Sequence, residues 1–259
     1  MDITILTLEY PDAQRKASRA WTYQEEMDFL TQYEPRNKFI RNLALAQTGN
    51  TLVLFQYVEK HGKQLHNMIE QRAKDGRRIF FVHGGTDTDQ REQVRHITEQ
   101  ESDAIIVASY GTFSTGINIR NLHNIIFASP SKSRIRNLQS IGRGLRTSES
   151  KDRCKLYDIG DDLSWKTKKN FTLLHLTERI KIYNDEHFVI ACGVDDTLTM
   201  QNLHDYEFIA VKDPVIFSTF KFLNHVGQVV ETIGMAPFIP TTSDEEILLP
   251  SESILTICN

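Results

Sequence analysis

The chain has 259 residues, of which 40% are hydrophobic and 25% charged, as in an ordinary globular protein with one large domain or one domain and an appendage. It contains no apolar run of about eighteen residues and no signal-peptide pattern at its start, so neither a membrane span nor a secretory leader is predicted. Cys154, Cys192 and Cys258 lack zinc-ligand spacing and argue against a disulfide framework. We therefore expect reduced thiols and a cytoplasmic location.

The net charge of −4 at pH 7 is distributed unevenly. Residues 1–187 hold 28 Lys and Arg against 24 Asp and Glu, whereas residues 188–259 hold two against ten. Between Arg120 and Lys155, nine residues are basic and two are acidic. Such asymmetry predicts a basic working surface followed by an acidic appendage, so the negative total does not exclude a nucleic-acid binder.

Strand-like and helix-like segments alternate along the chain. Thr22 and Glu25 have capping-box spacing, which marks a helix start, and Thr86 or Asp87 caps a later helix. Apolar runs predict strands at 3–10, 51–57, 77–85, 104–109, 124–130 and 153–160. Helices are expected at 22–30, 37–46, 61–73, 86–98, 133–146 and 170–188, the last one packing on the edge of the sheet. Alternation of this kind predicts a parallel sheet with helices on both faces over roughly residues 38–165.

In such sheets, ligands bind beyond the carboxyl ends of the strands. The segments expected there are His83 to Gly85, Ser109 to Asn118 and Ser129 to Lys132. A loop is predicted to carry Asp158, Asp161 and Asp162, which lack a complete metal-ligand set, so no metal site is expected. After about residue 190, short strand-like runs indicate either a small acidic β-rich module or an extension of the sheet.

The stretch QSIGRGLR, residues 139–146, is the most informative motif. If it is helical, Gln139, Arg143 and Arg146 lie on one face beside Gly142, which permits close approach of another backbone or of a ligand. Guanidinium groups suit phosphate oxygens, yet the sequence has no GxxxxGK[ST] phosphate-binding loop. The two arginines therefore either reach a phosphate held elsewhere or form a solvated basic helix end.

A second candidate is VASYGTFSTGINI, residues 107–119, which follows a predicted strand as a loop. Its hydroxyl side chains include Ser109 and Thr112, and Gly111 and Gly116 expose backbone amides. These groups suit phosphate or sugar contacts, although an ordinary polar connection is the alternative.

The order FFVHGG, IIVASYGTFSTGINI, QSIGRGLR resembles the second motor domain of superfamily 2 helicases, whose final motif is Gln-x-x-Gly-Arg-x-x-Arg. The stretches YPD at 10–12, TYQEE at 22–26 and NLH at 121–123 are similar to a phage helicase of recombination and repair in this superfamily. The resemblance covers about residues 1–187. It implies a RecA-like fold for residues 38–188. Residues 1–37 are expected to be an entry segment that leads in from a first motor domain, which this sequence lacks. An acidic, β-rich extension of unknown role is expected at 189–259.

The resemblance also implies roles for individual residues. Arg143 and Arg146 are expected to reach the phosphates of ATP, which is held with Mg²⁺ mainly by the first motor domain, and Gln139 and Gly142 belong to the same motif. Gly116 and Asn118 lie in the motif that links ATP to DNA, although many relatives have Asp at the second position.

DNA-backbone contacts are expected from the strand ends. The resemblance implies them for Phe55, Gln56, Gly84 and Ser109 of this sequence, and the hydroxyl of Thr112 suits the same role. Charge alone suggests Lys132, Arg134 and Arg136, with ordinary surface charge as the alternative. The partners implied are thus DNA, read with little sequence specificity, and a P-loop-bearing first motor domain in cis or in trans.

Three interpretations follow. The chain is the C-terminal motor half of an ATP-dependent DNA helicase or branch-migration enzyme, inactive alone. It is a non-catalytic DNA-binding or regulatory module derived from such a half. It is a truncated or split gene product.

Overall fold

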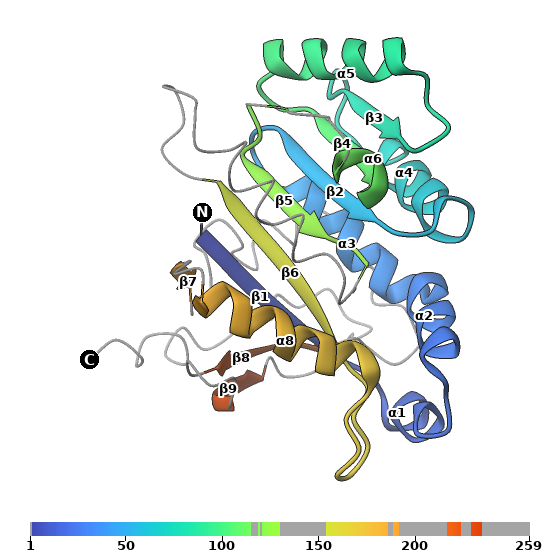
Figure 1. The fold of residues 1–259 in the computed structure, drawn as a ribbon, viewed down its shortest axis with the longest axis vertical. Helices are drawn as coiled ribbons and strands as arrows, with labels where there is room; N and C mark the ends of the chain where they lie inside the picture. The colour runs from blue at the N-terminus through green and yellow to red at the C-terminus, as the bar shows by residue number, and fades with distance from the viewer. Residues whose placement is uncertain are drawn as a thin grey trace, which may run out of the picture.

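The computed structural model describes residues 2–114, 119, 121–129, 154–185, 189–191, 217–223 and 229–234 (Figure 1). Its strands are β1 (Asp2–Glu9), β2 (Thr51–Phe55), β3 (Ile79–Val82), β4 (Ile105–Ser109), β5 (Asn124–Phe127), β6 (Lys155–Asp162), β7 (Val189–Ala191), β8 (Phe217–Leu223) and β9 (Val229–Gly234). Its helices are α1 (Asp12–Ser18), α2 (Tyr23–Gln32), α3 (Glu34–Ala46), α4 (Lys63–Glu70), α5 (Thr88–Gln100), α6 (Tyr110–Ser114) and α8 (Phe171–Asp185), with a π-helical turn η1 (Val58–Gly62) before α4.

The strands form one sheet in the order β3-β4-β2-β5-β6-β1-β8-β9, with β7 also paired to β1. From β3 to β1 every neighbouring pair is parallel, and β1 and β6 stay in register from Asp2↔Lys155 to Glu9↔Asp162. The predicted parallel sheet is confirmed. All carboxyl ends of these six strands therefore lie along one edge, which we call the carboxyl edge.

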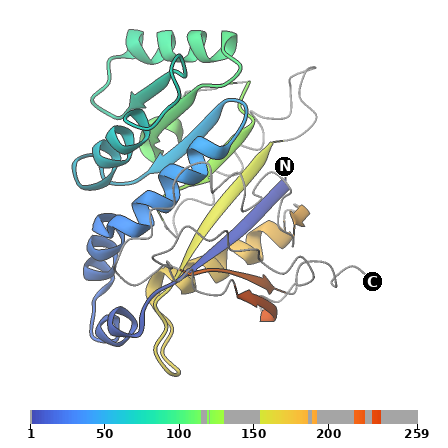
Figure 2. The same ribbon diagram turned by 180° about the vertical axis from the view of Figure 1, so that it is seen from behind.

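Helices cover both faces of the sheet. On one face α2, α3 and α4 pack against alternate strand residues, with Leu30, Ile40 and Leu65 fully buried (Figure 2). On the other face lie α8, which crosses in front of β6 and β1, and α5 (Figure 1). The continuous burial of β2, β4 and β5 explains why their sequences are apolar runs.

The sheet extends beyond the range that the sequence predicted for it. Residues 2–9 form β1 beside β6, and Ile3, Leu6 and Leu8 are core residues, so the sheet begins before residue 38. Whether residues 1–37 lead in from a first motor domain stays a prediction. The described parts of 189–259 are the strands β7, β8 and β9, which pair onto β1 or onto one another.

Local signals located several helix starts correctly. Thr22 and Glu25 form a complete capping box, and the Asp87 side chain caps α5 by accepting from the backbone N–H of Asp89. The connection after β4 differs from the predicted loop, because Tyr110–Ser114 form the short helix α6. Helix α8 packs on the face of β6, where Leu176 lies against Gly160, and not on the edge of the sheet. The helix predicted at 133–146 lies outside the described residues.

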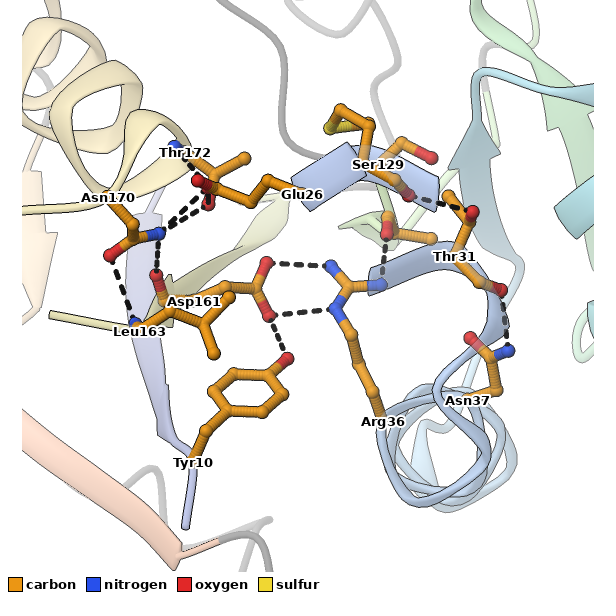
Figure 3. A network of polar contacts seen from close by, with 12 residues as sticks. Tyr10, Glu26, Thr31, Arg36, Asn37, Ser129, Asp161, Leu163, Asn170 and Thr172 are labelled. Carbon is orange, nitrogen blue, oxygen red and sulfur yellow. Dashed lines mark hydrogen bonds and ion pairs between the residues drawn. The ribbon is translucent and has the colours of Figure 1, made fainter. Parts of the chain in front are cut away.

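The aspartates predicted to lie in a loop are instead part of β6. Asp161 is fully buried and pairs with Arg36 of α3 through two hydrogen bonds of 2.8 and 3.0 Å (Figure 3). Tyr10, just beyond β1, donates to the same carboxylate at 2.7 Å, and Arg36 also donates to the carbonyl oxygen of Ala128 at 2.8 Å. Burial by itself would lower the pKa of Arg36, but Asp161 and Tyr10 together outweigh it and raise that pKa.

A second buried ion pair lies on the opposite face of β6. Asp158 accepts two hydrogen bonds from Arg179 of α8, at 2.8 and 2.9 Å, and one from the hydroxyl of Tyr183 at 2.6 Å. Burial, with the negative charge of Asp158, raises the pKa of Tyr183 well above its ordinary value. Asp158 and Asp161 are three positions apart, so they face opposite sides and anchor one helix each.

Glu26 of α2 caps the amino end of α8 (Figure 3). Its buried carboxylate accepts from the backbone N–H groups of Phe171 and Thr172, at 3.0 and 2.8 Å, and from the Thr172 hydroxyl at 2.7 Å. The Asn170 side chain joins the same oxygen at 2.9 Å and also donates to the backbone of Asp161. A carboxylate at a helix amino end satisfies orphan N–H groups and suits the helix dipole.

We predict that breaking the Arg36–Asp161 pair strongly destabilises the fold. Asp161→Asn leaves a buried guanidinium without its counter-charge, so the free energy of unfolding should fall by about 3–5 kcal/mol in urea titrations. The double variant Arg36→Met/Asp161→Leu removes both charges and should lose less than Asp161→Asn alone. Lys38→Met, on the same helix, breaks only the surface pair with Glu34 and should change stability by less than about 1 kcal/mol. Equal losses for Asp161→Asn and Lys38→Met would contradict the prediction.

Candidate nucleic-acid interface

At the end of β2, Phe55 and Gln56 face different surroundings. The side chain of Phe55 is fully buried and stacks on Phe81 with ring centroids 5.6 Å apart. Gly62 is pressed against this ring, since a Cβ there would lie 2.4 Å from it. Any contact that Phe55 makes with DNA therefore has to run through its backbone. Gln56 is half-buried, and among the described residues its Oε1 atom has no hydrogen-bond partner.

Ser129, two residues beyond β5, connects the ends of several strands. Its Oγ lies 3.1 Å from the backbone N of Gln56 and 3.1 Å from Nδ1 of His61, and its carbonyl oxygen accepts from the Tyr110 hydroxyl at 3.1 Å. Nε2 of His61 lies 3.1 Å from Oδ1 of Asn37. The tautomer with its proton on Nε2 satisfies every one of these bonds, with Ser129 donating to Nδ1.

His61 stays neutral in this arrangement. Burial penalises the charged imidazole, and the positive charge of Arg36 adds to the effect, so the pKa of His61 is lowered to about 3. The ring belongs to the π-helical turn η1 and lies 3.1 Å from Ser129 Oγ. His61 therefore acts as a fixed hydrogen-bonding group and not as an acid or base near neutral pH.

At the end of β4, the two hydroxyls predicted to contact DNA turn toward each other. Ser109 Oγ and Thr112 Oγ1 are 2.7 Å apart, and the two residues are only 8% and 3% exposed. Gly111 is exposed, with open space where a Cβ would lie. The exposed residue at this end of β4 is therefore Gly111, in the first turn of α6.

At the end of β3, a glycine turn is held open. Thr86 Oγ1 accepts from the backbone N–H of His83, and Nδ1 of His83 accepts from the N–H of Gly85 at 3.1 Å. Arg91 of α5 donates to the carbonyl oxygens of Thr86 and Gly84, at 2.8 and 3.3 Å. Gly84 is exposed, and no atom lies within 4 Å of its would-be Cβ, so a phosphate group has room to approach its backbone.

The structure brings Gln56, Gly84, Ser109 and Thr112 to the same carboxyl edge, as neighbours in strand order. The remaining predicted residues lie outside the described residues, namely Gly116, Asn118, Lys132, Arg134, Arg136, Gln139, Gly142, Arg143 and Arg146. Ser129 is the last described residue before 130–153, which hold seven of these. Its hydrogen bonds fix the position of Ser129 itself at the carboxyl edge.

Sequence reasoning missed the residues that fix this edge. Arg36 lies at the spacing of Ile40 and Leu43, and Arg179 at that of Leu176 and Tyr183, on core-facing helix stripes. A charged residue on such a stripe indicates a buried counter-charge. The aspartates of β6 are the residues that could have been predicted to supply it.

Residues 35–148 match the family described as helicase conserved C-terminal domain. This segment is a helicase C-terminal domain. The match contains every residue for which the sequence predicted a DNA-binding, ATP-binding or catalytic role.

The chain is 38% identical over 201 residues to the ATP-dependent DNA helicase UvsW of Enterobacteria phage T4. That match covers 73% of this chain and 39% of the phage protein. The crystal structure of T4 UvsW is similar with a TM-score of 0.63 at 35% identity, over 73% of this chain and 40% of that one. IRC3 of Saccharomyces cerevisiae, named as an ATP-dependent helicase, is 31% identical over 108 residues, which are 41% of this chain and 15% of that protein.

These comparisons confirm the predicted resemblance and the RecA-like helicase fold. The helicase C-terminal domain and its flanks span about two fifths of the phage relative. No helix in the described part of the chain is long and apolar enough to cross a membrane. Within that same part, no three His, Cys, Asp or Glu side chains gather as metal ligands.

We predict that His61 makes stability depend on pH. Between its unfolded pKa of about 6.5 and its folded value of about 3, only the unfolded chain binds the proton, so the free energy of unfolding falls as the pH is lowered. From pH 7.5 to pH 5.0 this contribution amounts to roughly 2 kcal/mol. The advantage of the natural chain over His61→Gln in urea titrations should shrink by that amount. Parallel pH profiles for the two proteins would rule the assignment out.

Proposed function

We propose that this chain supplies the second motor domain of an ATP-dependent DNA helicase or branch-migration enzyme in phage recombination and repair. The observation that carries the proposal is the 38% identity to phage T4 UvsW over 201 residues, which are 73% of this chain. The Gln-x-x-Gly-Arg-x-x-Arg motif at residues 139–146 agrees with it. Residues 38–188 form most of this motor domain, and β1 completes its sheet.

In this proposal, this domain contributes arginines to ATP hydrolysis, while another domain supplies the phosphate-binding loop. Arg143 and Arg146 reach the ATP phosphates, and Gln139 couples the nucleotide to movement. The P-loop pattern does not occur in the sequence, and the described residues hold no carboxylate cluster for Mg²⁺. ATP and Mg²⁺ are therefore assigned mainly to a first motor domain, in cis or in trans.

DNA is assigned to the carboxyl edge. The hydroxyls of Ser109 and Thr112 are buried there, whereas Gly84 and Gly111 are exposed. We assign phosphate contacts to the chain at these glycines and to Lys132 and Arg134, since backbone and cationic groups suit phosphate oxygens and read no base sequence. Binding should accordingly depend strongly on salt and weakly on sequence.

We predict that the chain alone hydrolyses no ATP and that a P-loop-bearing first motor domain added in trans restores DNA-stimulated hydrolysis. Arg143→Ala should then lower the rate about 10³–10⁵-fold, because the developing phosphoryl charge loses its counter-charge. Arg78→Ala is the matched control, since Arg78 precedes β3 at the opposite edge and pairs with Glu101. Release of phosphate, measured with and without DNA, gives the readout.

Two outcomes would overturn this assignment. Hydrolysis by the isolated chain would show that its phosphate site is not shared with another domain. A mixture that binds DNA but never hydrolyses ATP would favour the competing function, a non-catalytic DNA-binding or regulatory module.

A further inference from the structure

Two segments meet beyond the carboxyl ends of β6 and β1. Residues 163–170 connect β6 to α8 as a two-residue hairpin, in which Trp165 and Lys168 exchange both backbone hydrogen bonds at 3.0 and 3.1 Å. Helix α1 follows β1. In both ribbon views the hairpin projects from the body of the protein with α1 beside it (Figures 1 and 2).

Hydrogen bonds join these segments into one unit. Arg15 of α1 donates to the carbonyl oxygen of Ser164 at 2.8 Å, and the Ser18 hydroxyl donates to that of Leu163 at 2.9 Å. Lys168 donates back to the carbonyl oxygen of Arg19. Three contacts to backbone carbonyls fix the hairpin against α1, although the two segments are about 145 residues apart in sequence.

The joined unit is strongly basic. Within 12–19 and 163–169 six residues are basic and one, Asp12, is acidic, in a chain whose net charge is −4. Asp12 lies 3.3 Å from Arg15, which is half-buried, and the other five basic side chains are exposed. We call this unit the basic corner; its members are Arg15, Lys16, Arg19, Lys166, Lys168 and Lys169.

The hairpin presents its charge at a strained position. Lys166 has φ of 54°, and it is the one non-glycine residue with positive φ in the described part of the chain. Two-residue hairpins favour glycine or asparagine where φ is positive. A lysine there keeps a cation at the hairpin tip although its backbone conformation is unfavourable. Strain of this kind concentrates at functional sites.

The basic corner lies on the same edge as the predicted DNA contacts. In strand order, the carboxyl edge runs from Gly84 after β3 past Ser109, Gln56 and Ser129 to the hairpin after β6 and α1 after β1. Five strand spacings of about 4.8 Å give this edge a length of roughly 24 Å, close to the rise of seven base pairs.

We propose that the basic corner is a second phosphate-binding surface, which holds the DNA backbone as it leaves the strand ends of β2 to β4. The inference deepens the proposed function by extending its DNA interface, and it rests on DNA binding by this chain, not on ATP hydrolysis. Lysine and arginine side chains at the surface suit this role because they neutralise phosphates without reading bases.

The test compares two triple variants of the full chain in binding a 20-nucleotide single strand, measured by fluorescence anisotropy from 50 to 200 mM salt. Lys16→Gln, Lys166→Gln and Lys169→Gln together should raise Kd about tenfold or more at 50 mM and make the plot of log Kd against log salt shallower by about two to three. The control removes three charges elsewhere, each paired with a glutamate, as Arg78→Gln, Arg95→Gln and Lys181→Gln. The control should keep most of the affinity and the slope.

The possible outcomes distinguish the basic corner from the proposed motor function. Equal Kd and slope for the two triple variants would overturn the basic corner while leaving the proposed function intact. No DNA binding by the natural chain would overturn both. Failure of hydrolysis in the two-domain mixture, with the predicted salt slopes observed, would overturn the motor function alone.

One substitution at the hairpin tip gives two readouts, the Tm for backbone strain and the DNA affinity for charge. Lys166→Gly relieves the positive φ and removes one cation, so the Tm should rise by about 2–4 °C while DNA affinity falls. A lower Tm would contradict backbone strain at Lys166, and unchanged affinity in a variant with a raised Tm would contradict a phosphate contact at the hairpin tip.

Discussion

The buried ion pair between Arg36 and Asp161 is the interaction on which the carboxyl edge depends. Asp161 also binds Tyr10 beyond β1, and Arg36 also binds the carbonyl oxygen of Ala128 beyond β5, so one pair joins the ends of three strands. An uncompensated charge in this position is expensive, which means that the strand ends cannot separate without a large loss of free energy. From Ala128 the connection passes to Ser129 and on to His61 and Gln56, at the end of β2.

This rigid layer explains what the edge shows to a ligand. The hydroxyls of Ser109 and Thr112 and the ring of Phe55 face inward, where they stabilise one another and the core. The exposed residues of the edge include Gly84 and Gly111 and the cations of the basic corner. Phosphate-binding groups on a fixed scaffold lose little conformational entropy on binding. They hold the DNA backbone without recognising the base sequence.

The sequence predicted the sheet because its strands are buried on both faces and appear as apolar runs, and it predicted helix starts where a cap such as Thr22 or Asp87 is local. It failed where partners are distant. In the sequence, the aspartates of β6 are typical of a polar loop. Their counter-charges, Arg36 and Arg179, come from distant helices, so no local pattern predicts that the aspartates are buried in a strand. Glu26 caps a helix that begins 145 residues later, and the basic corner joins segments equally far apart, so no local pattern could reveal either.

The central claim is that the carboxyl edge is the surface that grips DNA. Hydrogen–deuterium exchange of the full chain, with and without a single-stranded oligonucleotide, tests it most directly. The account predicts slower exchange on DNA binding in peptides covering 83–86, 109–112 and 163–169. The turns around Asn50 and His123, at the opposite edge and held by their own hydrogen bonds, should exchange unchanged. Protection confined to that opposite edge would contradict the account.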